Sequence, residues 1–167
     1  NSATSALHLA LKLLDISSGA NVATPSLTFI STNHAIRYVN LYPKFVDVDK
    51  ETGNMSPDDL ERLLEKDRND SYYAEEEFLG FIKAIIVVHY SGYACDMDRI
   101  NAIAKKYNIP VIEDCAHAFG TRYRKLKAGN IGDIGCFSLL PEDFKQQGFP
   151  DTDFDGAQFK SDSSIDS

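Results

Sequence analysis

The chain has 167 residues, 43% of them hydrophobic and 25% charged, which is the length and apolar content of one globular domain or most of one. Its net charge of −8 argues against a nucleic-acid partner, because proteins that bind the phosphate backbone cluster Lys and Arg on one surface. A membrane partner is not expected either, since no apolar run approaches the about 18 residues of a span and the first residues lack a signal-peptide layout.

Helical and extended segments alternate from the first residues onward. Apolar positions from Ala3 to Leu14 fall on one helical face, and residues Asp15 to Gly19 end that helix. The pattern then predicts a short strand over Asn21 to Thr24, a second helix over Ser26 to Arg37 and a strand over Lys44 to Val48.

The same alternation continues through the middle of the chain. Ser56, Pro57 and Asp59 mark a helix start with a serine cap, and we expect this helix to run to about Lys66. The segment from Asp67 to Gly80 is interpreted as a solvated excursion. The later predicted elements are a strand buried on both faces over Ile82 to Val88, a helix over Asp96 to Tyr107 ended by a left-handed Asn108, and a buried strand at Val111-Ile112.

The three cysteines, Cys95, Cys115 and Cys136, are odd in number and widely spaced, and they form no CxxC pair. This spacing indicates neither a disulfide framework nor a metal site. A reducing cytoplasm is the location that fits such cysteines best.

Strands separated by helices of this length predict an α/β three-layer sandwich with a mostly parallel central sheet. Ligands of such sheets bind at the carboxyl ends of the strands. Two strands end in polar residues, Val88-His89 and Ile112-Glu113-Asp114, so we expect His89 and Asp114 to converge on one crevice. Asp114 could equally cap a turn, and for His89 or His117 alone a core or rim position is the favoured interpretation.

Other groups near the expected crevice match the needs of pyridoxal phosphate (PLP). Asn1 to Ser5 starts a helix, where N–H groups and hydroxyls can hold a phosphate, although ordinary N-capping explains them as well. Phe29, one turn into the second predicted helix, is either core or the cover of a flat ring. A carboxylate such as Asp114 beside the pyridine nitrogen favours the protonated ring that acts as an electron sink.

Six short stretches then occur in order between residue 1 and about residue 138. They are Asn1-Ser-Ala-Thr-Ser-Ala-Leu7, Thr24-Pro-Ser-Leu-Thr-Phe29, Phe45-Val-Asp-Val-Asp49 with Thr52-Gly-Asn54, Val88-His-Tyr90 with Asp96-Met-Asp98, Val111-Ile-Glu-Asp114 with Ala116-His117, and Gly132-Asp133 with Cys136-Phe-Ser138. Together they resemble the DegT/DnrJ/EryC/StrS sugar aminotransferases, a branch of the fold-type I PLP enzymes.

The resemblance implies that residues 1–140 form the large PLP-binding domain of such an enzyme, in incomplete form. It also implies transfer of an amino group from glutamate to a keto group on a nucleotide-linked sugar, in a homodimer when the chain is complete, and no metal. The cofactor contacts that it implies are Thr4, Ser5 and Ser138 at the phosphate, Phe29 over the ring, Asp114 at the ring nitrogen, and His117 near the phenolic side.

The chain departs from the family pattern after Ser138. The family has its Schiff-base lysine five residues beyond that serine, where this chain has Asp143; Lys145, two residues further on, is the candidate catalytic lysine. Residues 141–167 hold seven acids against two lysines, and we expect this acidic tail to be poorly ordered.

Three functions therefore compete. The first is the cofactor-binding half of a nucleotide-sugar aminotransferase, from a chain that we expect to be a fragment. The second is a catalytically inactive fragment or pseudoenzyme that still binds PLP, phosphate or a partner chain, which the missing lysine favours. The third is a sugar dehydratase relative with histidine in place of the lysine, but no histidine lies near position 143.

Overall fold

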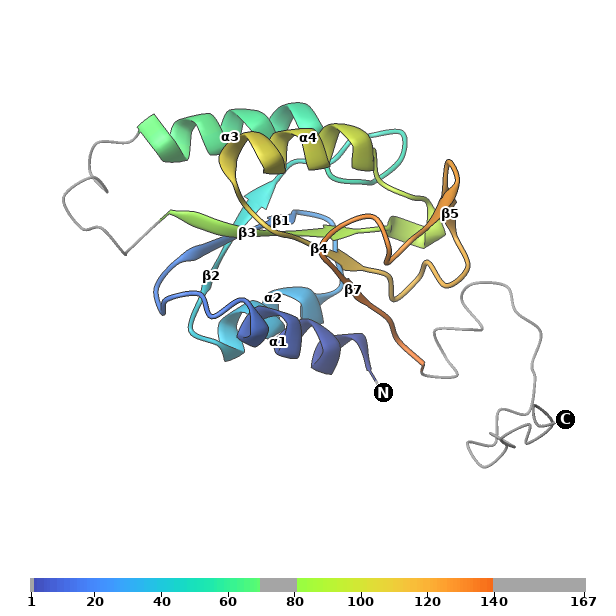
Figure 1. The fold of residues 1–167 in the computed structure, drawn as a ribbon, viewed down its shortest axis with the longest axis horizontal. Helices are drawn as coiled ribbons and strands as arrows, with labels where there is room; N and C mark the ends of the chain where they lie inside the picture. The colour runs from blue at the N-terminus through green and yellow to red at the C-terminus, as the bar shows by residue number, and fades with distance from the viewer. Residues whose placement is uncertain (1, 70–80, 140–167) are drawn as a thin grey trace, which may run out of the picture.

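The computed structural model describes residues 2–69 and 81–139, which form three layers (Figure 1). The middle layer is a parallel sheet in the order β2-β1-β3-β4-β7. Its strands are β1 (Asn21–Pro25), β2 (Tyr42–Val46), β3 (Ile82–Val88), β4 (Val111–Asp114) and β7 (Ile134–Cys136). The predicted α/β sandwich with a mostly parallel sheet is confirmed.

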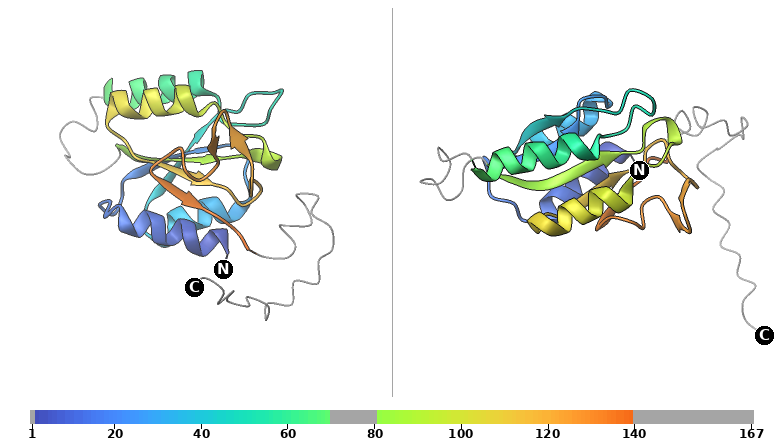
Figure 2. Two further views of the ribbon diagram at one scale, coloured as in Figure 1. Left: turned by 45° about the vertical axis from the view of Figure 1, so that its right-hand side comes forward. Right: turned by 90° about the horizontal axis from the view of Figure 1, so that it is seen from above.

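Two helices cover each face of the sheet. Helices α1 (Ala3–Leu13) and α2 (Ile30–Tyr38) lie on one face, and α3 (Pro57–Asn69) and α4 (Met97–Tyr107) lie side by side on the other (Figures 1 and 2). A short 3-10 turn, η2 (Tyr90–Gly92), follows β3, and a small antiparallel hairpin is formed by β5 (Arg122–Tyr123) and β6 (Leu126–Lys127). None of the helices in the described ranges combines the length and apolar character needed to cross a membrane.

Strand alternation places the two large apolar clusters of the core on opposite sides of the sheet. Ile85 and Val87 of β3 pack with α3 and α4, whereas Ile86 packs with α1 and α2. In β4, Val111 belongs to the first side and Ile112 to the second. Because successive strand residues face opposite layers, the next two residues of β4, both acids, are also directed to opposite sides.

Several helix and strand ends lie where capping residues and apolar runs in the sequence predict them. Helix α3 begins at Pro57, with the hydroxyl of Ser56 accepting a hydrogen bond from the Asp59 N–H at 3.3 Å. Helix α4 ends at Tyr107, and its C-cap Asn108 has the left-handed φ of 54°. Strand β3 has the predicted bounds, and β4 extends two residues further than expected, to Asp114.

The predicted start of the second helix is wrong. Helix α2 begins at Ile30 instead of Ser26, and Phe29 is extended, with φ −69° and ψ 143°. The cause is a bond between distant segments: the Ser26 N–H donates to the Val46 carbonyl at 2.9 Å, which continues the sheet ladder before the chain turns into the helix layer. Phe29 is 73% exposed, so its interpretation as a core residue is also wrong.

The expected excursion begins later than predicted, because α3 continues to Asn69 and buries Asp67. The Asp67 carboxylate accepts a hydrogen bond from the Ile82 N–H at 3.0 Å and so satisfies the first donor of β3. Burial raises the pKa of Asp67 above its ordinary value. The rest of the excursion and the acidic tail, residues 70–80 and 141–167, lie outside the described residues, as do Asp143 and Lys145.

Strand β7 and the β5–β6 hairpin were not predicted, because each strand has only two or three residues. A side chain at Gly135 of β7 would place its Cβ 2.4 Å from the carbonyl oxygen of Gly129. Only glycine therefore fits at this close approach of the β6–β7 loop to the edge strand.

Candidate cofactor site

Asp114 ends β4 and is the buried acid of the site, with 5% of its surface exposed. Its Oδ1 accepts a hydrogen bond from the Ala116 N–H at 3.1 Å, and its Oδ2 accepts one from the Thr32 hydroxyl at 3.0 Å. Burial raises the pKa of Asp114 above its ordinary value, against the opposing effects of these bonds and of nearby His117. A cationic partner strongly stabilises the ionised form of a buried carboxyl whose pKa is raised.

Thr32 and Thr28 were not identified from the sequence, although a chain of hydrogen bonds links both to Asp114. The hydroxyls of Thr28 and Thr32 are 2.8 Å apart, and Thr32 is fully buried. An ionised carboxylate only accepts hydrogen bonds, so Thr32 donates to Asp114 and in turn accepts from Thr28. A hydroxyl on the apolar face of α2, beside Ala35 and Ile36, was the sequence signal that could have indicated this role.

The N-terminal end of α1 approaches the same edge of the sheet. Ser2 is the helix N-cap, and its hydroxyl accepts from the Ser5 N–H at 3.3 Å; Thr4 is half-buried and Ser5 is exposed. Helix α1 packs against β4 and β7. The first N–H groups of a helix precede its internal hydrogen bonds, and with the helix dipole they favour an anion.

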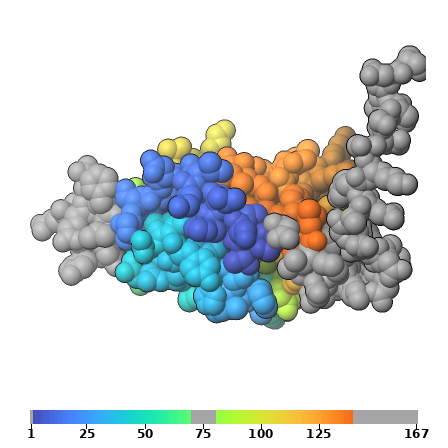
Figure 3. All heavy atoms as spheres, turned by 90° about the horizontal axis from the view of Figure 1, so that it is seen from below, coloured from blue at the N-terminus to red at the C-terminus, as the bar shows by residue number. Residues whose placement is uncertain are grey.

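Ser138 also lies near the edge of the sheet that the start of α1 approaches. Cys136 is level with Asp114 in the β4–β7 pairing, so Ser138 follows two residues beyond the sheet, and it is buried. Figure 3 shows the dark blue start of α1 beside the orange segment that ends at residue 139. A hollow of about 390 Å³ opens there, lined by Ser2, Ser5, Ala6, Leu9, Phe119, Phe137 and Leu139. The structure thus brings Ser5 and the segment of Ser138 together.

Phe29 and His117 complete the set of predicted site residues. The Phe29 carbonyl accepts a hydrogen bond from the Thr32 N–H at 3.1 Å, which places Phe29 one turn before the partner of Asp114. Its exposed ring is free to cover a planar ligand. His117 is half-buried and lies close enough to Asp114 to interact with it electrostatically.

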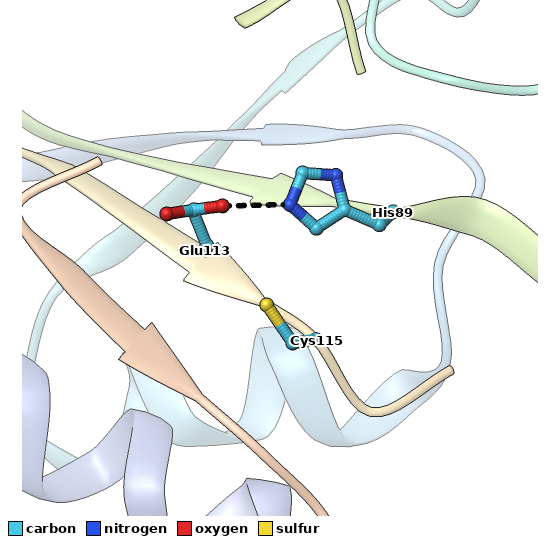
Figure 4. Close-up of side chains that lie close together, drawn as sticks. All are labelled: His89, Glu113 and Cys115. Atoms are coloured by element: carbon cyan, nitrogen blue, oxygen red, sulfur yellow. Dashed lines mark hydrogen bonds and ion pairs between the residues drawn. The ribbon is translucent and has the colours of Figure 1, made fainter. Parts of the chain in front are cut away.

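The predicted convergence of His89 with Asp114 is wrong. His89 is fully buried on the other side of the sheet, where its Nε2 is 2.9 Å from Oε2 of Glu113 (Figure 4). Its Nδ1 accepts from the Cys95 N–H at 3.1 Å, so Nε2 carries the proton and donates to Glu113. The interpretation of His89 as a core histidine with satisfied nitrogens is therefore confirmed.

Glu113 fastens the loop that leads into β7. Besides His89, it accepts hydrogen bonds from the N–H groups of Gly129, Ile131 and Gly132 at 2.9, 2.7 and 2.6 Å. Burial raises the pKa of Glu113, but these four hydrogen bonds outweigh it and hold the pKa below its ordinary value. The Cys115 thiol lies near this pair (Figure 4), and burial raises its pKa. With both nitrogens of His89 engaged, the cluster is structural.

Asn54, from the Thr52-Gly-Asn54 stretch, joins the segments that follow β2 and β3. Its Nδ2 donates to the carbonyls of Tyr93 and Ala94 at 3.1 and 3.2 Å, and its Oδ1 accepts from the Tyr90 N–H at 2.9 Å. The side chain is almost fully buried. This stretch therefore fixes the segment after β3 relative to the segment after β2.

The donor set fits PLP. A buried carboxyl that accepts from two fixed donors among the described residues suits a cationic ring nitrogen, and the hydroxyls and N–H groups at the start of α1 suit a phosphate. An exposed phenyl ring at Phe29 suits the flat face of the ring.

Comparison with known proteins identifies the family. The sequence profile described as "DegT/DnrJ/EryC1/StrS aminotransferase family" matches residues 1–143. The GDP-perosamine synthase of Escherichia coli O157:H7 is 44% identical over 137 residues, which is 82% of this chain and 34% of the relative.

Solved structures give the same result. An aminotransferase from Brucella abortus of the same family name superposes with a TM-score of 0.74 at 34% identity, covering 84% of this chain and 36% of that one. A Streptococcus pneumoniae protein known in a PLP form gives a TM-score of 0.69 at 30% identity, covering 84% and 36%. The chain spans about a third of the length of these relatives. With its match over residues 1–143, the chain belongs to the DegT/DnrJ/EryC1/StrS aminotransferase family.

Proposed function

We propose that residues 1–140 are the PLP-holding part of an aminotransferase that acts on nucleotide-linked keto sugars. The observation that carries the proposal is Asp114, a buried carboxyl held by two donors at the end of β4, beside the start of α1. When bound, PLP supplies an electron sink for the carbon that loses or gains a proton.

Each residue of the site has a separate task in this proposal. Asp114 accepts a hydrogen bond from the protonated ring nitrogen and keeps that nitrogen charged. Phe29 covers one face of the ring and excludes water from it. The hydroxyls of Thr4, Ser5 and Ser138, with the first N–H groups of α1, bind the phosphate, and His117 lies at the phenolic side.

Family membership supports the substrate class. The E. coli relative carries the name of a GDP-sugar synthase, and we infer for this chain a keto sugar attached to a nucleotide as acceptor and glutamate as amino donor. A homodimer is part of the proposal, supported by apolar side chains left exposed on α1 and α2, namely Leu9, Leu13, Ile30 and Tyr38.

A cytoplasmic location is inferred for the same protein. Cys95, Cys115 and Cys136 are free and buried. Burial raises the pKa of Cys95 and of Cys136 to about 12, so both thiols stay protonated and unreactive. Such thiols suit a compartment that keeps cysteines reduced.

A second candidate is favoured by one observation: Asp143 stands where the family has its lysine. A carboxylate cannot form the covalent link to PLP that an amine forms. In this alternative the chain binds PLP or phosphate through the same residues but transfers no amino group.

Borohydride reduction in the presence of PLP, followed by peptide mass mapping, separates the two candidates. A single modified peptide containing Lys145, absent from Lys145→Ala, supports the aminotransferase. Saturable PLP binding without a specific adduct supports the inactive alternative. No binding of either kind contradicts both.

A further inference from the structure

We propose that Thr32, supported by Thr28, is a positioning residue that holds the Asp114 carboxylate in the orientation and charge state required at the cofactor ring nitrogen. The proposal rests on the function inferred above and names a residue of α2 that none of the family comparisons assigns. Its basis is a chain of three oxygens, from Thr28 just before α2, through Thr32 in α2, to Asp114 at the end of β4, each on a buried or half-buried residue.

The hydrogen bonds of Asp114 come from two separate elements. Oδ1 is held by the Ala116 N–H, which belongs to the turn after β4, and Oδ2 is held by Thr32, which belongs to α2. A carboxyl fixed at both oxygens cannot rotate about its terminal bond without breaking one of them. Helix α2 therefore sets the plane of the carboxylate and, through Phe29 one turn earlier, also presents the exposed ring.

The direction of the hydrogen bonds favours the ionised acid. Thr32 has one proton, and in donating it to Asp114 it leaves its own lone pairs to the Thr28 hydroxyl, which is 2.8 Å away. Hydrogen bonds to the charged form oppose the effect of burial on this acid. Without the Thr32 hydroxyl, Asp114 would hold its proton to a higher pH and would meet a cationic ring less often as a carboxylate.

Four other titratable side chains surround Asp114, and any test of Thr32 has to leave these residues unsubstituted. His117 follows it in the chain, His89 lies at the end of β3, Cys115 is its neighbour, and Cys136 pairs with it from β7. The Thr32 variants keep all four of these residues.

The chain offers a matched control at Thr24. Its side chain is fully buried, and strand alternation directs it to the same α1/α2 layer as Thr32. Its hydroxyl has no hydrogen-bond partner among the residues that the structure describes. Thr24→Val therefore removes a buried threonine hydroxyl in this layer without touching Asp114.

The test has two arms and uses the full chain. In the first, carbon-13 NMR follows the Asp114 carboxyl in the cofactor-free chain, assigned with Asp114→Asn. We expect Thr32→Val to move the Asp114 titration to higher pH, while Thr32→Ser and Thr24→Val leave it unchanged. Equal titration in Thr32→Val and the wild type overturns the proposal.

The second arm measures the affinity for pyridoxamine 5′-phosphate, which needs no lysine, by calorimetry across pH. We expect Thr32→Val to weaken binding about tenfold at neutral pH, as for a lost hydrogen bond to a charged group, with the deficit shrinking as pH rises. A deficit that does not change with pH indicates a merely structural role and contradicts the proposal. If the wild type itself binds nothing, the proposed function fails, and the first arm still decides whether Thr32 controls Asp114.

Discussion

Glu113 and Asp114 are neighbours in β4, and the contrast between them shows how one strand serves two purposes. Glu113 faces the α3/α4 side and accepts four hydrogen bonds, whereas Asp114 faces the α1/α2 side and accepts two. The pKa of Glu113 is held below its ordinary value and that of Asp114 is raised by burial. Among the described residues Glu113 is the more fully hydrogen-bonded acid and anchors the fold, whereas Asp114 keeps hydrogen-bonding capacity that we propose serves a ligand.

Removal of Glu113 is expected to have the largest effect. Glu113→Ala leaves the His89 ring and three backbone N–H groups without their acceptor in a buried place, which should lower the free energy of unfolding by roughly 3–5 kcal/mol. Urea denaturation measures the loss. Glu51→Ala, at an exposed site, is the control, and a loss of less than about 1 kcal/mol at position 113, typical of an exposed pair, would argue against the anchoring role.

The isosteric substitution Asp114→Asn should reduce cofactor affinity and leave the stability of the fold nearly unchanged. Asp114→Asn keeps an oxygen for the Ala116 N–H and an amide N–H from which the Thr32 hydroxyl can accept, but it cannot stabilise a charged ring nitrogen, so the affinity for pyridoxamine 5′-phosphate should fall roughly 10- to 100-fold. The free energy of unfolding should change little or rise, because a costly buried charge is removed. Calorimetry and denaturation of one preparation check both. Unchanged affinity would mean that Asp114 is an ordinary turn acid.

The two acids should also respond to pH in opposite directions. The raised pKa of Asp114 contributes stability that is present below the ordinary aspartate value of about 3.9 and is lost as pH rises through the folded-state pKa. The lowered pKa of Glu113 contributes stability above the ordinary glutamate value of about 4.3, lost as pH falls through the folded-state pKa.

Denaturation across the acid range measures this difference. Relative to the wild type, Asp114→Asn should become more stable as pH rises from about 3.9 towards the folded-state pKa of Asp114. The deficit of Glu113→Gln should instead grow as pH rises from the folded-state pKa of Glu113 to about 4.3. Parallel curves for the two variants would show that the surroundings of the two carboxylates do not differ as described.

The smallest expected effect is at Phe29. Its ring is largely exposed, so Phe29→Ala should change the free energy of unfolding by no more than about 0.5 kcal/mol. Loss of ring stacking should still weaken pyridoxamine 5′-phosphate binding by about 2- to 10-fold. Phe45→Ala, at another exposed phenylalanine on the edge strand β2, is the matched control. Equal affinities for the two variants would remove Phe29 from the site.

Elements with a local cause were predictable from the sequence. Ser56-Pro57 specified a helix start, Asn108 specified a left-handed end, and the apolar run of β3 specified a strand buried on both faces. Asp114 was identified because an acid at the end of a buried parallel strand falls on the ligand edge. Each of these inferences depends only on residues that are close together in the sequence.

What escaped prediction depends on contacts between distant segments. The start of α2 is set by the Ser26 hydrogen bond to Val46, and the role of Thr32 by a bond to a residue 82 positions away. His89 was assigned to the wrong side because the alternation of β3 had to be carried past its last strand residue. Sequence periodicity gives the faces of a strand but not which side chain from another element meets each face.

Amide chemical-shift mapping with pyridoxamine 5′-phosphate tests the central claim most directly, because it locates the ligand as well as detecting it. We predict saturable shifts confined to the start of α1, Phe29, Thr32, the segment Asp114 to His117, and Ser138, with inorganic phosphate shifting only the start of α1 and Ser138. Shifts that gather on the α3/α4 face, or none at saturating ligand, would contradict a cofactor site centred on Asp114.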